Sequence, residues 1–260
     1  MIFLIIDFHV HLGKVVRGWI NVLNSIGIES EEQVEKEVDE LIAEMDKYGI
    51  DKAVVFPNPR LPHEYKLAND EIAKAQQLYP DRIIGFCRVD PRDLKIAIEE
   101  LERSVLTLGL KGLKLHPVME VFTVDHDHII KVVRKAADLG IPVIIHSGMS
   151  MMASANRFNK LAEKVPEATI IMAHFTTYPS NILVAKKHKN IYLETSAAIN
   201  PKVIEVAVKE IGAERILYGS DWPYLDMRFE KLKIELANID DEEKKLILGR
   251  NALRILGLER

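Results

Sequence analysis

The stretch IFLIIDFHVHLGKVVRG, residues 2–18, separates two possible α/β folds for this chain. The apolar run Ile2–Phe8 predicts a first β-strand, and two histidines, His9 and His11, follow it one residue apart. In a doubly wound sheet this place usually carries a glycine-rich phosphate loop, G-x-G-x-x-G. The residues after Phe8 lack that pattern, which disfavours the doubly wound sheet. The other possible α/β fold depends on how strands and helices alternate in the rest of the chain.

Short apolar or β-branched runs recur eight times. They are Ile2–Phe8, Ala53–Phe56, Ile83–Val89, Gly112–His116, Pro142–His146, Thr169–Ala173, Ile191–Thr195 and Ile216–Gly219. Segments of helical periodicity follow them, near 31–48, 66–79, 93–107, 126–139, 155–164, 180–188, 202–211, 227–237 and 241–256. Alternating strands and helices indicate βαβ units and a parallel sheet. We therefore predict an α/β fold, a (β/α)8 TIM barrel formed by residues 1–260 as one domain.

Helix-end signals support this division of the chain. Asp125 can cap the helix that follows it, and Gly140 can end that helix. Asp240 or Asp241 can cap the last helical segment. The acidic residues after them suit the positive end of a helix dipole.

Bulk composition excludes several classes of function. The 260 residues are 48% hydrophobic and carry a net charge of −4. Without a basic stripe or a cationic amphipathic segment, no nucleic acid and no membrane surface is expected as a partner. No run approaches the roughly 20 apolar residues of a membrane span. The one cysteine, Cys87, rules out an intramolecular disulfide framework, which fits a cytoplasmic protein.

Polar residues gather at the ends of the predicted strands, where barrel enzymes place their active sites. Five of the nine histidines end such a strand. The residues at these positions are His9, His11, Lys114, His116, His146, His174 and Asp221. Any one of them alone could be structural: a hydrogen-bonded histidine, a buried lysine paired with a carboxylate, or an aspartate in a turn. Together they indicate a site.

Side-chain alternation sharpens this prediction. His9 and His11 share parity, so both can point into the barrel mouth, with Phe8 and Val10 facing the helices. By the same rule Lys114 shares a face with His116, opposite Leu113 and Leu115, and His146 shares a face with Ile144.

Imidazole and carboxylate are ligands that zinc and similar divalent metals prefer. His9, His11, His146 and Asp221 could supply four such ligands from three strands. The sequence DHDH at 125–128 resembles a ligand cluster, but it opens a helix, so we interpret it as a helix start.

The order of these motifs resembles the amidohydrolase superfamily. H-x-H follows strand one, a polar residue strand four, histidines strands five and six, and aspartate strand eight. The sequences GLKLHP, AHF, YGSDWPY and GRNALRILGL resemble the amidohydrolase-related branch, which contains the aminocarboxymuconate-semialdehyde and resorcylate decarboxylases. The resemblance covers essentially the whole chain.

The resemblance implies one divalent metal per chain, with zinc expected, held by His9, His11, His146 and Asp221. It places His174 near the metal-bound water or the substrate as an acid–base group. In binuclear members a carboxylated lysine after strand four bridges two metals. Lys114 lies near that place, but His116 is nearer the strand end, so the binuclear site is the minor alternative.

Two enzymatic hypotheses remain open on the sequence alone. In the first, a metal-activated water cleaves an amide, ester or lactone-like bond, with Asp221 and His174 moving the protons. In the second, the same metal serves non-oxidative decarboxylation or hydration of a small carboxylic acid. A non-catalytic metal-binding protein is a weaker third hypothesis, because His174 exceeds what a structural site needs.

Both enzymatic hypotheses require a small-molecule substrate, and homo-oligomers are possible. A decarboxylase needs a cationic clamp for a carboxylate, and Arg60 and Arg88 follow strands two and three. The residues expected to contact substrate are His116, Lys114, Arg60, Arg88 and Trp222. Residues 13–30, with Trp19, form a long connection that suggests a lid or an interface.

Overall fold

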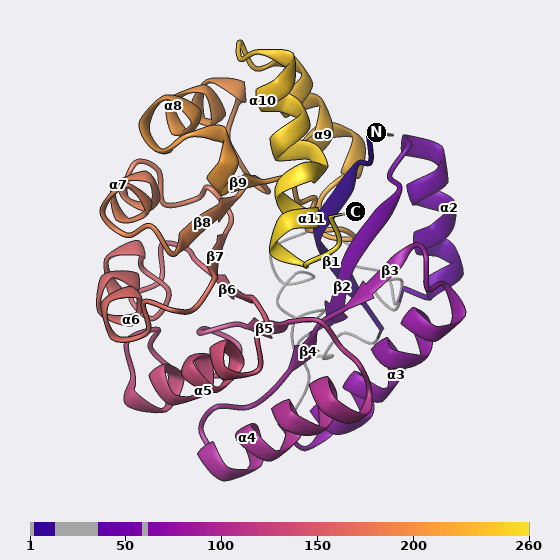
Figure 1. Cartoon of the computed structure of the whole chain (residues 1–260), viewed down its shortest axis with the longest axis vertical. Coiled ribbons are helices and arrows are strands. Elements are labelled where there is room, and N and C mark those ends of the chain that lie inside the picture. Colours follow the sequence, from indigo (N-terminus) through magenta and orange to yellow (C-terminus); the bar gives the residue numbers. More distant parts are fainter. Residues whose placement is uncertain (1–2, 14–35, 59–61, 260) are drawn as a thin grey trace, which may run out of the picture.

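The computed structural model describes residues 3–13, 36–58 and 62–259, in which parallel strands form a ring surrounded by helices (Figure 1). The strands are β1 (Ile6–Leu12), β2 (Lys52–Pro57), β3 (Ile83–Gly85), β4 (Cys87–Arg88), β5 (Leu113–Leu115), β6 (Val143–His146), β7 (Ile170–Ala173), β8 (Ile191–Glu194) and β9 (Ile216–Leu217). β3 pairs with β2 and β4 with β5, so these two short strands, separated by Phe86, occupy one position of the barrel. The eight strand positions in the described residues confirm the predicted barrel.

Helices cover the outside of the ring. They are α2 (Val38–Tyr48), α3 (Tyr65–Leu78), α4 (Leu94–Glu102), α5 (Asp127–Asp138), α6 (Phe158–Lys164), α7 (Ser180–Lys187), α8 (Pro201–Ile211), α9 (Met227–Leu236), α10 (Asp241–Lys245) and α11 (Asn251–Ile255). Short 3-10 turns are η2 (Pro62–Glu64), η4 (Ala155–Arg157) and η5 (Ala213–Arg215), and π-helical turns are η3 (Arg103–Thr107) and η6 (Leu246–Arg250).

The helix ends follow the sequence signals with one exception. Gly140, at φ 70°, lies just after α5, and the Asp240 side chain caps α10 in a capping box with Glu243. The prediction that Asp125 caps α5 is wrong. The cap is His126, whose ring accepts a hydrogen bond from the His128 amide. The Asp125 carboxylate, one residue too early, instead accepts a 2.7 Å hydrogen bond from Arg157.

A β-bulge in β1 corrects the predicted direction of Phe8. Asp7 pairs with Ala53 but Val10 pairs with Val55, so β1 holds one residue more than β2 over this interval. Phe8 therefore packs inside the barrel, not against the helices, whereas Val10 packs against the helices as predicted. β1 also continues to Leu12 instead of ending at Phe8.

Backbone hydrogen bonds complete the ring between its first and last strands. The amide of Phe8 donates to the Tyr218 carbonyl, and the amide of Asp221 donates to the His9 carbonyl, both at 2.8 Å. The carboxylate of Asp7 accepts hydrogen bonds from the amides of His9 and Ser220, which joins the bulge to the segment after β9. These bonds bring Asp221 beside the H-x-H motif.

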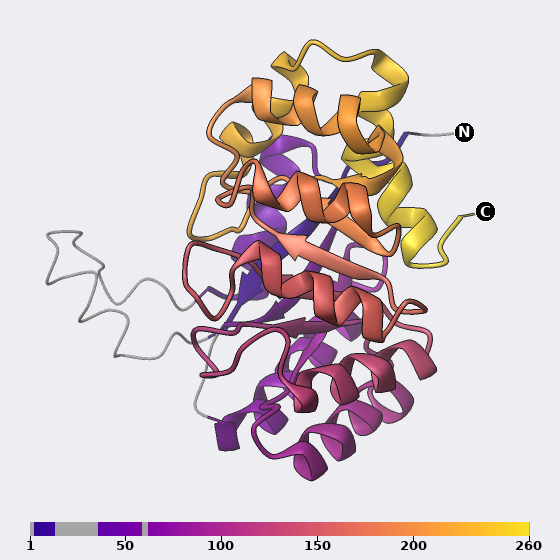
Figure 2. The ribbon, with the colours of Figure 1, turned by 90° about the vertical axis from the view of Figure 1, so that its left-hand side faces the viewer.

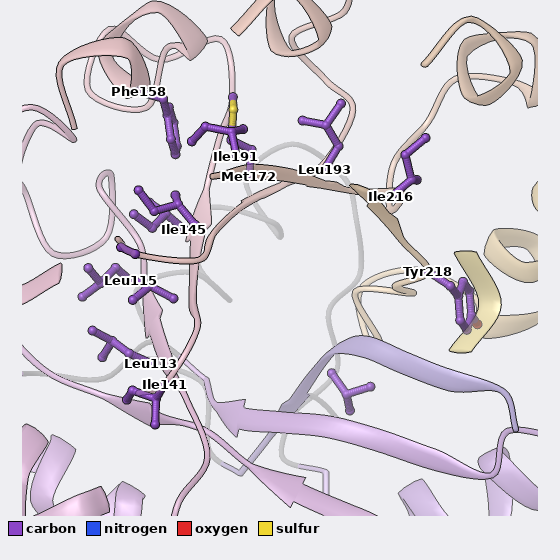
Figure 3. Packing of buried hydrophobic residues seen from close by; sticks show 14 of the residues in the cluster. Leu113, Leu115, Ile141, Ile145, Phe158, Met172, Ile191, Leu193, Ile216 and Tyr218 are labelled. Carbon is purple, nitrogen blue, oxygen red and sulfur yellow. The ribbon is translucent and has the colours of Figure 1, made fainter. Parts of the chain in front are cut away.

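The hydrophobic core has two layers. The larger one lies between strands and helices and includes Leu113, Ile145 and Met172, whose side chains point outward from the ring (Figure 3). The smaller one fills the barrel interior and includes Phe8, Phe56 and Ala252. This division confirms that Leu113 and Ile145 face the helices.

The C-terminal segment lies at the end of the barrel opposite the strand ends. In Figure 2 α11, in yellow, lies near the marked chain ends, whereas β7 points the other way. A Cβ on Gly249 in η6 would come within 1.8 Å of the Leu4 carbonyl oxygen, so the absence of a side chain permits this close packing. The polar residues at the strand ends therefore face the other mouth.

Candidate metal centre and active site

Three side chains from the two ends of the chain converge at the strand ends. The Nε2 atoms of His9 and His11 are 3.2 Å apart. Oδ1 of Asp221 lies 3.1 Å from the first and 3.2 Å from the second. Asp221 has a positive φ of 59°, unusual for a residue with a side chain, which turns the chain sharply after β9. Such a group of atoms could hold a metal ion.

The hydrogen bond at the far side of the His9 ring shows that these donors suit a metal. Nδ1 of His9 lies 2.7 Å from Oε2 of Glu194, and both side chains are fully buried. A carboxylate can only accept, so Nδ1 carries the proton and Nε2 presents its lone pair to the group when the ring is neutral. A carboxylate behind a ligating histidine is the usual arrangement in metal sites.

Electrostatics favour the metal-binding states of the other two groups. Burial lowers the pKa of His11 to about 3, so this ring is neutral near pH 7. Burial acts to raise the pKa of Asp221, but His9 and His174 outweigh it and hold that pKa well below its usual value. Two imidazoles and an ionised carboxylate suit a divalent cation.

His9 itself has a raised pKa. Burial and Lys114 act to lower it, and the carboxylates of Asp221 and Glu194 outweigh them. A cation at Nε2 would compete with that proton, as metals do at histidine ligands.

His146 lies next to the three converging groups but is not one of them. Its Nδ1 is 3.0 Å from Nε2 of His174, and its ring stacks on His116 at 3.9 Å. His174 in turn lies beside His9, with ring centroids 4.8 Å apart, and its Nδ1 contacts the Ser196 hydroxyl at 2.7 Å. The role of His146 as fourth ligand and that of His174 in chemistry stay predictions.

Lys114 lies at the floor of the site. Its Nζ is 3.0 Å from Nε2 of His9 and lies over the Phe56 ring, and burial lowers its pKa to about 7. Lys114 and Ile144 both face the barrel interior, as their parity predicts.

Arg88 is completely buried beside this floor. It is the in-register partner of Lys114, and its guanidinium donates to Glu120 at 2.9 Å and to the Pro57 carbonyl at 3.0 Å. Its Nη2 has no partner among the residues that the structure describes. These contacts give Arg88 a structural role, and its role as a carboxylate clamp stays a prediction. Arg60, the other predicted clamp, and most of residues 13–30 with Trp19 lie outside the described residues.

The Trp222 side chain packs in the larger core layer, and its contact with substrate stays a prediction. Its carbonyl accepts the His11 amide at 2.8 Å. Tyr224 has the better position for contact with a bound molecule. Its ring lies edge-on to His11, its hydroxyl donates to Asn58 at 2.8 Å, and it is 41% exposed.

Sequence reasoning missed Glu194, Ser196, Glu120 and Tyr224. Glu194 ends β8, so the rule that selected the other strand-end residues would also have selected it. Ser196 and Glu120 lie in loops that carry no comparable signal.

Comparisons with known proteins show the family of this chain. A family model described as Amidohydrolase matches residues 6–258, so the chain belongs to the amidohydrolase family. It falls in the amidohydrolase-related branch that its motifs resemble.

Two curated relatives of this chain are decarboxylases. The gamma-resorcylate decarboxylase of Polaromonas is 23% identical over 85% of this chain and 88% of its own length. The 2-amino-3-carboxymuconate-6-semialdehyde decarboxylase of Dictyostelium discoideum is 21% identical over 74% of this chain and 66% of its own.

Solved structures share the fold. A 2,6-dihydroxybenzoate decarboxylase superposes with a TM-score of 0.81 at 19% identity, over 99% of this chain and 100% of the other. A dihydroxybenzoic acid decarboxylase from Polaromonas, solved with bound manganese and 2-nitroresorcinol, gives a TM-score of 0.81 at 20% identity, over 100% and 98% of the two chains.

Among the described residues of the present chain, every helix is too short or too polar to cross a bilayer.

Proposed function

We propose that this protein is a metal-dependent, non-oxidative decarboxylase of a small carboxylic acid. The observation that carries the proposal is the convergence of His9, His11 and Asp221 at the strand ends of an amidohydrolase barrel. The curated relatives named above are decarboxylases, which supports this hypothesis over hydrolysis of an amide, ester or lactone. Aromatic hydroxy acids and muconate-like acids are the substrate classes to test first.

The metal would be held by His9, His11 and Asp221, with His146 as the fourth ligand. Zinc is the metal expected from the ligand types. Manganese in the related dihydroxybenzoic acid decarboxylase makes Mn²⁺ the other ion to test. When bound, such a cation polarises a substrate oxygen and neutralises developing negative charge.

The reaction breaks a carbon–carbon bond and releases CO₂, and a proton takes the place of the lost carboxylate. Oδ1 of Asp221 faces both histidines, so Oδ2 is the oxygen that would take up a proton from water and pass it to the substrate carbon. His174, whose ring lies beside His9, would act as a second acid–base group in this proton transfer. Lys114 and His116 border the same space and would contact the polar groups of the substrate.

An assay of product chemistry tests the proposal. The protein is stripped of metal, reloaded with Mn²⁺ or Zn²⁺, and given hydroxybenzoates and muconate-like acids in one panel and lactones, esters and amides in another. We expect CO₂ release from the first panel, lost in Asp221→Asn. Turnover of the second panel alone, without CO₂, would show that the enzyme is a hydrolase.

A further inference from the structure

One buried carboxylate, that of Glu194, receives hydrogen bonds from several parts of the site. Oε2 lies 2.7 Å from Nδ1 of His9, accepts the Ser196 hydroxyl at 2.8 Å, and accepts the His174 amide at 3.3 Å. Oε1 accepts the Ser196 amide. The side chain is fully buried, so its two oxygens face protein donors and not water.

These contacts fix the direction of the hydrogen bond between Ser196 and His174. A hydroxyl has a single hydrogen, and Ser196 gives it to the carboxylate. Towards Nδ1 of His174, 2.7 Å away, the same oxygen can therefore only accept. Nδ1 of His174 must carry the proton, which leaves a lone pair on Nε2 of the neutral ring.

The same reasoning extends one ring further. Nε2 of His174 lies 3.0 Å from Nδ1 of His146. Because the first atom is an acceptor, the second must be a donor. His146 then carries its proton on Nδ1 and has a lone pair on Nε2, the atom left for a metal.

We propose that Glu194 sets the tautomers of two candidate metal ligands at once. It acts on His9 directly, and on His146 through the Ser196 hydroxyl and the His174 ring. Both ligands then keep a lone pair on Nε2, the atom through which each would hold a metal. Glu194 and Ser196 are positioning residues in this arrangement, because they act through the histidines. The inference rests on the proposed metal site, but its first prediction concerns the metal-free protein.

The test is the tautomeric state of the histidines, measured by long-range ¹H–¹⁵N correlation spectra of ¹⁵N-histidine-labelled, metal-free protein. Single His→Gln variants assign the signals. We expect His146 and His174, and His9 at a pH where its ring is neutral, to carry their protons on Nδ1, although a free histidine in water favours the Nε2–H form. A proton on Nε2 of His174 or His146 in the wild-type protein would overturn the proposal, whatever the variants do.

Variants separate the direct contact of Glu194 with His9 from its relay to His146 through Ser196 and His174. Ser196→Ala should release His174 and His146 from the Nδ1–H form and leave His9 unchanged. Glu194→Gln should change the tautomers of all three rings, those of His9, His146 and His174. Ser196→Thr, which keeps a hydroxyl, should show the same tautomers as the wild-type protein. Ser147→Ala is the matched control, because this buried hydroxyl lies directly after β6, next to His146 in the sequence, but donates to the Ala173 carbonyl. Unchanged His174 and His146 signals in Ser196→Ala would contradict the relay.

Metal affinity gives a second readout that needs no substrate. Loss of a group that orients a ligand typically weakens metal binding about 10–100-fold. Competition titrations with Mn²⁺ and Zn²⁺ should show weakening in that range for Ser196→Ala and Glu194→Gln, and none for Ser147→Ala. Equal affinity in all three variants would overturn the positioning role. A failure to release CO₂ from any acid would contradict the proposed reaction and leave these measurements intact.

Discussion

Arg88 and Glu120 form an ion pair inside the barrel, with Nε of the first 2.9 Å from Oε1 of the second and both side chains buried. The same carboxylate accepts the Tyr65 hydroxyl at 2.9 Å and the His116 amide at 2.8 Å. The pair therefore joins strand β4 to the loop that holds His116, whose ring stacks on His146. This position makes it both a stability element and a neighbour of the site.

Replacing Arg88 by Met should destabilise the protein strongly. Removing one partner of a buried pair leaves an uncompensated charge and typically costs about 3–5 kcal/mol. We expect a loss of that size in urea unfolding, and partial recovery in the Arg88→Met/Glu120→Gln double variant. Unchanged stability together with a large rise in KM for an acid substrate would instead favour Arg88 as a carboxylate clamp.

The wild-type protein should carry one tightly bound divalent metal per chain. His9→Ala/His11→Ala should lose it, because the variant removes two of the three converging groups. Elemental analysis after gel filtration measures this. His126→Ala/His128→Ala, which removes another close pair of rings, 4.9 Å apart, is the control and should keep the metal. Full metal content in the first variant would exclude the assigned site.

Lys114 should bind no second metal. Its Nζ faces Nε2 of His9 and the Phe56 ring, so it stands at the floor of a single site. A crystal structure of the metal-loaded protein should show one anomalous peak per chain and an unmodified lysine. Two peaks bridged by a carboxylated side chain would establish the binuclear alternative.

His174→Ala should still bind the metal, but about 10–100-fold more weakly, because His146 loses its hydrogen-bond partner. With the site saturated with metal, the variant should lose turnover by about 10²–10⁴-fold, the usual contribution of a general acid or base. The ring lies beside His9 and forms a second close group with His9 and Glu194, but it does not belong to the group formed by His9, His11 and Asp221. Metal content and turnover are measured on the same preparation. A variant that takes up no metal even at saturating concentration would make His174 a ligand, and one with full turnover would make it structural.

Stability should fall as pH rises from about pH 4.5 to 7 because of Glu230. Burial raises the pKa of this carboxyl to about 7, although Lys233 is 2.6 Å away. The folded state then holds a proton that the unfolded state has released, so the free energy of unfolding decreases across this window. Each pKa unit corresponds to about 1.4 kcal/mol.

The Glu230→Gln variant isolates this contribution. We expect it to be more stable relative to wild type at pH 8 than at pH 5, by about 1 kcal/mol or more. Urea unfolding of both proteins at the two pH values measures the difference. An equal difference between the two proteins at pH 5 and pH 8 would contradict it.

The sequence alone predicted the architecture and much of the site. Parallel strands buried on both faces appear as apolar runs, and helices appear as periodic segments, so the eight alternations were visible locally. The rule that barrels place chemistry at strand ends then selected His9, His11 and Asp221, which the structure brings within 3.2 Å of one another.

Tertiary structure decided what local patterns cannot carry. Alternation placed Phe8 against the helices, but a single extra residue in β1 turned it into the barrel interior beside His9. The partners of the site histidines were equally invisible, since Glu194 lies 185 residues from His9 and meets it only because the strands close into a ring. Sequence periodicity predicts which side chains of a segment are buried. Closure of the barrel and the bulge in β1 decide which of these buried side chains face each other.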